Sequence, residues 1–228
     1  PWEGTTSLYQ TVFKDGDLYR MYYRGSSHAG YTFPSFVAPG ETVIPEHEEV
    51  TCYIESKDGI NWTRPSLELI EFQGSKENNI VWIGNQDGGH NFAPFKDDNP
   101  AAQASQRYKA VGSSRLNGKP VLLGFVSPDG IHWSKIQEEP VITDGKFDSL
   151  NVAFWDVVRG HYVAIYRDFR NGVRTIKHAT SRDFVNWTPG RFADYGDTPR
   201  EQLYTNATTP YFRAPHIYLA FPKRLLPW

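Results

Sequence analysis

Alternating apolar and polar residues form short stretches along the whole chain, and turn residues such as Gly, Asp and Asn separate them. The clearest stretch is centred on a tyrosine and reads DGDLYRMYYRG, SQRYKAVGSS, RGHYVAIYRDF and APHIYLAFPKR in its successive copies. A second set opens near an asparagine and reads HNFAPF, LNVAFW and TNATTPY, and a third reads VTCYIES, PVLLGFVS and VRTIKHATS. This alternation is typical of half-buried β-strands. The chain is therefore predicted to be all-β.

A heptad of the form Ser-x-Asp-[Gly/Phe]-[Ile/Val]-[Asn/His]-Trp ends each strand of the third set. It reads SKDGINW at residues 56–62, SPDGIHW at 127–133 and SRDFVNW at 181–187. In a tight turn the Asp can accept backbone N–H bonds and Gly tolerates positive φ, so the heptad is expected to be structural, with its Trp starting a return strand and packing between blades. Each repeat then holds an Asn-led strand, a Tyr strand, a third strand and the return strand. Four antiparallel strands in a unit of about 40–60 residues make a blade of a β-propeller.

The repeats predict a single propeller domain over residues 1–228, apparently incomplete at its C-terminus. Its blades are expected at about 1–70, 71–140 and 141–195, with a partial fourth blade at about 196–228. The fourth repeat stops at LAFPKRLLPW, just after its second strand and before a third strand or a heptad. About three and a half blades are therefore predicted. Residues 28–49 and 96–106 interrupt the repeats and are predicted to be surface loops. An unpaired blade edge would favour aggregation, so a homo-oligomer that covers the edge is a candidate partner.

Composition narrows the function classes. The formal net charge is -2 and the sequence pI is about 6.4, which gives no support for nucleic-acid binding. No apolar stretch approaches the ~18 residues of a membrane span, so no membrane partner is expected. Cys52 is the single cysteine, which excludes an internal disulfide. The first residues lack the pattern of a signal peptide; a secreted or periplasmic location is expected if one has been removed, and a cytoplasmic one otherwise.

The three heptads and the strand pair TSLYQTVFKDGDLYRMYYRGSS make the chain resemble the five-bladed propeller glycoside hydrolases, the superfamily that contains families 32 and 43. The resemblance implies five blades in a complete propeller and hydrolysis of a plant or algal poly- or oligosaccharide. It implies no required cofactor and leaves room for a structural calcium ion in the central funnel. The alternatives are a non-catalytic carbohydrate-binding or assembly propeller and a different hydrolase or lyase on the same scaffold.

Members of this superfamily carry three carboxylates near the start of their innermost strands. The residues at matching places are Glu3, Asp148 and Glu201. Glycoside hydrolysis needs one protonated acid and one ionised base or nucleophile. By resemblance, Glu201 is expected to be the acid, Glu3 the base or nucleophile, and Asp148 the residue that orients and tunes them. The structural alternatives are a terminal carboxylate for Glu3, a turn cap for Asp148 and a solvated loop residue for Glu201.

Other polar and aromatic side chains at these strand ends are expected to bind substrate. An aromatic ring can stack on a sugar, an arginine can hold an acidic group by two hydrogen bonds, and asparagine can donate to hydroxyls. The alternatives are packing, ion pairs between blades and turn-forming asparagines. No His-Glu-x-x-His or Gly-x-Ser-x-Gly string occurs, so neither a catalytic zinc site nor a serine nucleophile is expected, and no metal-binding residue is predicted. The predicted substrate-binding residues are Trp2, Arg24, His90, Asn91, Asn151, Arg167, Asp168 and Asn206.

Overall fold

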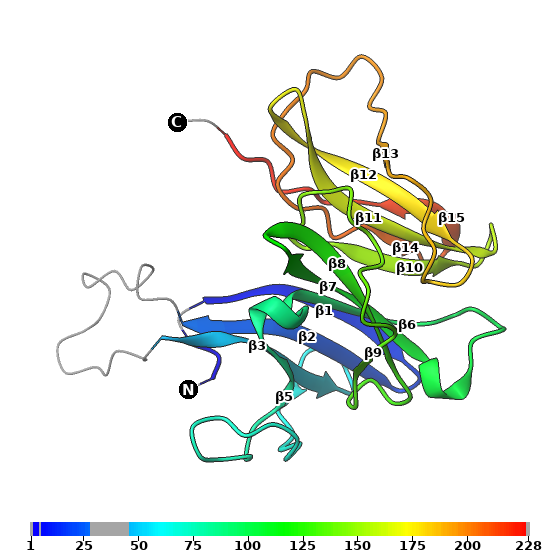
Figure 1. The fold of residues 1–228 in the computed structure, drawn as a ribbon. Helices are drawn as coiled ribbons and strands as arrows, with labels where there is room; N and C mark the ends of the chain where they lie inside the picture. The colour runs from blue at the N-terminus through cyan, green and yellow to red at the C-terminus, as the bar shows by residue number, and fades with distance from the viewer. Residues whose placement is uncertain (1, 5, 28–45, 227–228) are drawn as a thin grey trace. The chain divides into compact units, whose positions relative to one another are not determined.

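The computed structural model describes residues 2–4, 6–27 and 46–226 (Figure 1). The chain divides into two compact units, Pro1–Phe92 and Ala93–Trp228, and each is described by itself. Apart from the 3-10 turns Asn85–Asp87 and Ala104–Gln106, the regular elements of the described residues are β-strands. The predicted all-β class is confirmed.

The first unit is built on one antiparallel sheet whose strands follow one another in chain order. Its buried residues Tyr23, Val50, Cys52 and Ile80 form a core against which Trp2 packs. A fifth strand also pairs with the third strand of this sheet, although its residues fell in the range predicted for the second blade. The strands are β1 (Thr6–Asp15), β2 (Leu18–Ser27), β3 (His47–Ser56), β4 (Trp62–Thr63) and β5 (Ile80–Ile83).

Two further four-stranded sheets and one two-stranded sheet follow, and each again runs in chain order. The Asn-led stretches are the first strands of these sheets, and the Tyr stretches are the second. This is the predicted arrangement of propeller blades with a partial last blade, and it is confirmed. The second sheet has β6 (His90–Lys96), β7 (Tyr108–Leu116), β8 (Lys119–Ser127) and β9 (Ser134–Lys135); the third has β10 (Val152–Asp156), β11 (His161–Arg170), β12 (Val173–Ser181) and β13 (Arg191–Phe192); the last has β14 (Thr209–Tyr211) and β15 (Ala214–Leu219).

The heptads form the predicted turns. In the second copy, Asp129 Oδ1 accepts hydrogen bonds from the backbone N–H of Ile131 and of His132, both at 2.8 Å. In the third copy, Asp183 accepts the equivalent bonds at 2.9 and 2.7 Å. Burial opposes ionisation of both carboxyls, but these hydrogen bonds and those from the side chains nearby outweigh it and lower the pKa of each to about 2.

The third heptad has Phe184 at the position of the turn glycine, with φ at 68°. A non-glycine residue in this region costs roughly 1–2 kcal/mol. Phe184 is fully buried, and its ring lies 5.7 Å from that of Phe95 in β6 and 5.2 Å from that of Tyr162 in β11. Burying this ring between the second and third sheets offsets the strain of the turn.

The two predicted surface loops both contain a buried carboxylate. Residues 28–45 lie outside the described residues, but Glu49, at the end of the first loop, belongs to β3 and is 3% exposed. In the second loop, Asp97 is buried and binds the ammonium of Lys109 at 2.6 Å. The prediction was wrong for these two residues, because a partner from a distant strand makes burial of each charge tolerable.

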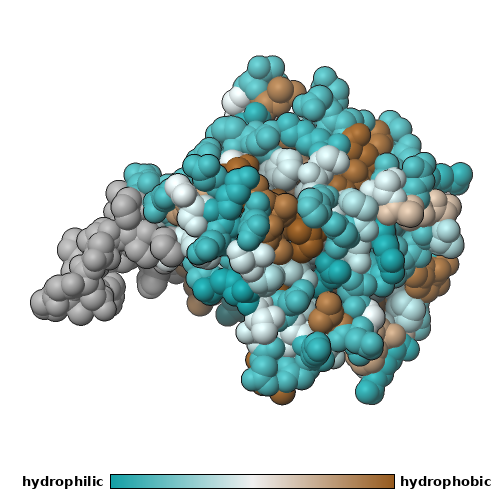
Figure 2. Space-filling model, turned by 90° about the horizontal axis from the view of Figure 1, so that it is seen from below, coloured by the Kyte–Doolittle hydropathy of each residue, from teal (hydrophilic) through white to brown (hydrophobic). Residues whose placement is uncertain are grey.

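Most of the face seen in Figure 2 is hydrophilic, with hydrophobic residues in separate patches among the polar ones. Exposed hydrophobic side chains are frequent in and beside the last sheet, where Phe212 is 80% exposed and Phe221 is 76% exposed. A sheet of two strands covers little apolar surface, which accounts for these exposures.

Candidate functional site

A buried polar cluster lies in the first unit where β2 ends and where β3 and β6 begin. Arg24 Nη1 donates to Asn91 Oδ1 at 3.0 Å and lies 3.3 Å from Glu49 Oε1. The second oxygen of Glu49 is 2.7 Å from His90 Nδ1. The guanidinium of Arg24 also lies over the ring of Tyr9, 5.0 Å from its centroid. The structure thus brings three predicted residues together around Glu49, which was not predicted to belong to the site.

Strand alternation explains this cluster. Arg24 is the cross-strand partner of Thr51, so both side chains lie on one face of the first sheet, while Tyr23 and its partner Cys52 lie on the other. Arg24 Nε, Thr51 Oγ1 and Asn91 Nδ2 are buried and have no hydrogen-bond partner among the described residues. A buried polar group without a partner costs about 1–3 kcal/mol, and ordered water or a bound ligand normally satisfies it.

Trp2 and Glu3 lie on the opposite face of the same sheet. The Glu3 carboxylate accepts hydrogen bonds from the Tyr23 hydroxyl and, at 2.8 Å, from Arg64 Nη2. Burial, with the bond to Glu3 adding to it, raises the pKa of the Tyr23 hydroxyl. Trp2 donates from Nε1 to Asn79 Oδ1 at 2.7 Å and packs edge-on against Phe72. Trp2 therefore contributes to packing in the first unit, and Glu3 is held by two partners.

The second unit holds the other two predicted carboxylates. Asp148 lies in the loop before β10, and its Oδ2 is 3.6 Å from Arg167 Nη2 at the end of β11. Arg167 is 5% exposed, and its guanidinium stacks over the ring of Tyr204 at 5.2 Å. Glu201, three residues before Tyr204, binds Arg224 through both carboxylate oxygens at 3.0 Å. Arg167 therefore connects the Asp148 loop to the segment that carries Glu201.

The opposite face of the third sheet carries a second charged cluster. Lys177 Nζ lies 3.0 Å from Asp144 Oδ2 and 3.2 Å from Asp168 Oδ2, and the Tyr166 hydroxyl donates to Asp144 at 2.8 Å. Burial opposes ionisation of Asp144, but the bonds from Tyr166, Gly190 and Lys177 outweigh it and lower its pKa. Asp168 was predicted to bind substrate, and here it is part of a network that fixes Lys177. No sequence pattern pointed to Asp144 or Lys177.

Asn151 and Asn206 are buried where the first strands of their sheets begin. Asn151 Nδ2 donates to the carbonyls of Phe147 and Ser149 at 2.9 and 2.8 Å, and Asn206 Oδ1 accepts from the Thr208 N–H at 3.0 Å. These bonds hold the turns that lead into β10 and β14. Both asparagines therefore shape the ends of the strands near Asp148 and Glu201.

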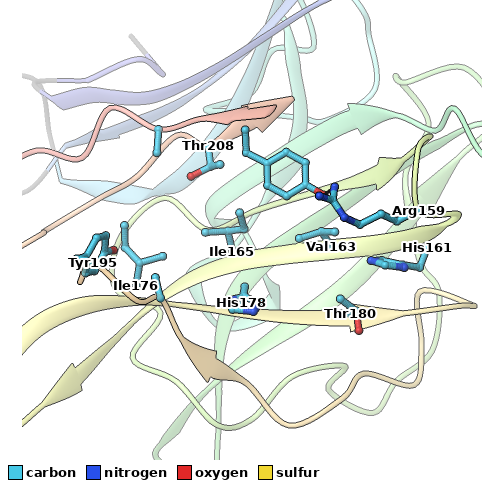
Figure 3. A pocket seen from close by; sticks show the side chains of 12 residues that line it. Arg159, His161, Val163, Ile165, Ile176, His178, Thr180, Tyr195 and Thr208 are labelled. Atoms are coloured by element: carbon cyan, nitrogen blue, oxygen red, sulfur yellow. Dashed lines mark hydrogen bonds between the residues drawn. The ribbon is translucent and has the colours of Figure 1, made fainter. Parts of the chain in front are cut away.

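An apolar groove of about 460 Å³ lies on the Arg167 face of the third sheet. Figure 3 shows Val163 and Ile165 of β11 and Ile176 and His178 of β12 lining one side, with Thr208 on the other. The groove has no carboxylate among its lining residues. It therefore lacks the pair of carboxylates that glycoside hydrolysis requires.

The predicted site residues are divided between the two units. Glu3 belongs to the first unit, and Asp148 and Glu201 belong to the second, so the convergence of the three carboxylates stays a prediction. Within the described residues there is no group of three or more His, Cys, Asp or Glu side chains that could hold a metal ion. The same part of the chain contains no helix long and apolar enough to span a membrane.

Comparison with known proteins supports the fold. No family model matches the chain, and no curated protein is similar to it in sequence. Solved structures do match. A fructofuranosidase from Schwanniomyces occidentalis complexed with fructosylnystose superimposes with a TM-score of 0.58 at 15% identity, over 91% of this chain and 38% of that one. The chain resembles the propeller glycoside hydrolases in fold.

Two more solved structures match the chain with TM-scores above 0.5. The fructan 1-exohydrolase IIa from Cichorium intybus matches with a TM-score of 0.51 at 13% identity, over 89% of this chain and 35% of that one. An N-acetylgalactosamine deacetylase from F. plautii, in complex with blood group B trisaccharide, matches with a TM-score of 0.54 at 14% identity, over 90% of this chain and 59% of that one. The chain spans less than two thirds of each of these proteins. At such identities the likeness shows the fold alone.

Proposed function

We propose that the chain carries the propeller scaffold of a glycoside hydrolase that acts on a plant or algal poly- or oligosaccharide. The observation that supports this most directly is the double contact of Arg167. Its guanidinium is 3.6 Å from Asp148 and stacks over Tyr204, so two carboxylate-bearing segments that precede successive first strands are held by one buried side chain. Carboxylates gathered at that end of the strands are the groups that glycoside hydrolysis requires.

In this proposal Glu201 is the general acid, Glu3 is the base or nucleophile, and Asp148 orients its neighbours. Asp148 and Glu201 have side chains 69% and 46% exposed, so a substrate can reach both carboxylates. The Glu3 side chain is 32% exposed and is fixed by Arg64. In a hydrolytic centre, the acid and the base or nucleophile would be about 5–10 Å apart.

The cluster around Arg24 is proposed to bind substrate hydroxyls. His90 is the most exposed member, with 24% of its side chain accessible, whereas Arg24 and Glu49 are 11% and 4% accessible. The buried carboxylate of Glu49 fixes Nδ1 of His90, and the partly exposed imidazole ring is well placed to contact a sugar. Asn91 has a buried amide nitrogen that can donate to such a ligand.

The test is hydrolysis of a panel of aryl glycosides, fructans, arabinans and xylans, with released sugar measured by chromatography. Glu201→Gln should lower kcat by at least ~100-fold on any substrate that the unaltered chain cleaves, because general acid catalysis typically contributes 10²–10⁴-fold. Glu138→Gln is the matched control, because Glu138 is 87% exposed in a turn of the second sheet. Unchanged turnover in Glu201→Gln would remove Glu201 from the mechanism.

One observation favours the alternative of a carbohydrate-binding propeller without hydrolysis. One nitrogen of Arg224, Nη1, lies 3.0 Å from both carboxylate oxygens of Glu201, so the side chain is held by an ion pair, as in a purely structural or binding role. Calorimetric titration of the same glycans separates the two functions. Saturable binding with no released sugar from any substrate would establish the binding module.

A further inference from the structure

A second cavity, of about 440 Å³, lies in the second unit and differs in character from the apolar groove. Its walls come from the hairpin that joins β11 to β12, from the loop that follows β13, and from the segment that carries Glu201. Its lining includes two arginines, a tyrosine and the proposed acid: Arg170, Arg200, Tyr195 and Glu201. The cavity therefore places two guanidinium groups and an aromatic ring beside the proposed acid.

The charges of this cavity leave the two arginines available. Glu201 is paired with Arg224, whose Nη1 lies 3.0 Å from both of its carboxylate oxygens. Asp194 Oδ1 accepts a hydrogen bond from the Gly196 N–H at 2.9 Å, so this carboxylate caps a turn of the loop that follows β13. Within the part of the chain that the structure describes, neither Arg170 nor Arg200 forms an ion pair. The Arg170 guanidinium lies over the ring of Phe192, 5.6 Å from its centroid.

Tyr195 adds an apolar surface to the cavity. The residue is 43% exposed, so part of its ring is open to a ligand. Burial of the hydroxyl end raises its pKa, although a hydrogen bond with Thr175 opposes the shift. Aromatic residues with a buried polar end and an open face are suited to contact the C–H side of a sugar ring.

From this geometry we infer that the cavity binds an acidic sugar residue, carboxylated or sulfated, with Arg170 and Arg200 on its anionic group and Tyr195 against its ring. Arginine is suited to this role because its planar donor fork matches carboxylate and sulfate oxygens in pairs. The inference deepens the proposed function and rests on it for the nature of the ligand. It narrows the expected substrates to polysaccharides that carry uronic acid or sulfate groups.

The experiment measures binding of free monosaccharides, which contain no bond to hydrolyse. Galacturonic acid, galactose 6-sulfate, galactose and inorganic sulfate are titrated into the intact chain and followed by ligand-observed NMR. Arg170→Gln and Arg200→Gln are compared with Arg115→Gln, an exposed arginine of the second sheet whose Nη1 donates to the Gly118 carbonyl at 3.1 Å. Circular dichroism checks that each variant is folded.

Galacturonic acid or galactose 6-sulfate should bind more tightly than galactose, and the tighter of the two identifies the acidic group. Each cavity variant should weaken that binding by about tenfold, because a lost hydrogen bond to a charged group has this size, and Arg115→Gln should leave it unchanged. Equal affinity for galactose, or affinities within about twofold of the unaltered chain in both cavity variants, would overturn the inference. Inorganic sulfate binding as tightly as either acidic sugar would also overturn it, because the cavity would then recognise an anion and not a sugar.

The two proposals can fail separately in this design. Arginine-dependent binding of an acidic sugar without hydrolysis of any glycan would refute the hydrolase and keep the binding site. Hydrolysis of neutral glycans without binding of acidic sugars would refute the binding site and keep the hydrolase.

Discussion

The ion pair between Lys109 and Asp97 offers the sharpest test of how the second and third sheets are held together. Lys109 Nζ lies 2.6 Å from Asp97 Oδ2, and the two side chains are 3% and 0% exposed. The same oxygen accepts a hydrogen bond from the Tyr162 hydroxyl of β11 at 2.7 Å. Replacing Lys109 with Met keeps most of the length and apolar stem of the side chain and removes its charge.

The expected loss is large because the carboxylate stays behind in the core. Removing one partner of a buried ion pair costs about 3–5 kcal/mol. For a chain of this size, each kcal/mol lowers Tm by about 2–4 °C, so Lys109→Met should lower Tm by roughly 6–20 °C. Lys135→Met is the comparison: its partner Glu138 is 87% exposed at 3.4 Å, so that ion pair contributes about 0–1 kcal/mol and the loss should be much smaller than in Lys109→Met.

A double variant tests the reason for the loss. Lys109→Met combined with Asp97→Asn has no buried charge, and the amide oxygen that replaces the carboxylate can still accept the hydrogen bond of Tyr162. Urea unfolding followed by circular dichroism should show the double variant to be more stable than Lys109→Met by at least ~1 kcal/mol. A loss of unfolding free energy below ~1 kcal/mol in Lys109→Met, or no recovery when Asp97→Asn is added, would show that the stranded carboxylate is not the cause.

Two further predictions concern the heptad turns and the packing of β2 against the N-terminal residues. The folded-state pKa of Asp129 and of Asp183 is about 2, below the ordinary 3.8, so the stability that these carboxylates supply is present above about pH 4 and is lost as the pH falls towards 2. In urea titrations, the double variant Asp129→Asn/Asp183→Asn should therefore lose less stability over that pH window than the parent. A pH profile of stability equal to that of the parent would contradict this assignment. A Cβ at Gly25 would lie 2.6 Å from the Trp2 carbonyl oxygen and 2.8 Å from Glu3 Cα. Gly25→Ala should therefore lower the free energy of unfolding by about 1–3 kcal/mol and alter the tryptophan fluorescence. A Tm and an emission spectrum like those of the parent would refute this.

The sequence by itself determined the strands, the turns and the repeat. Strand alternation depends on neighbouring residues, and each heptad supplies its own hydrogen-bond acceptor and turn residue. The bonds of Asp129 to Ile131 and His132 span only two and three residues, so they recur wherever the heptad occurs. The same local logic explains why Asn151 and Asn206, predicted to bind substrate with turn formation as the alternative, hold the turns at the starts of their strands.

Only the tertiary structure decided which charged residues are buried and with which partners. Glu49 and Asp97 lay in segments predicted as surface loops, and each is buried because a cation from a separate strand reaches it: Arg24 from β2 and Lys109 from β7. The contact of Arg167 with Tyr204 likewise joins segments far apart in the chain. A buried charge is stable only when its partner is in place, and that condition depends on the packing of whole sheets and not on any local pattern.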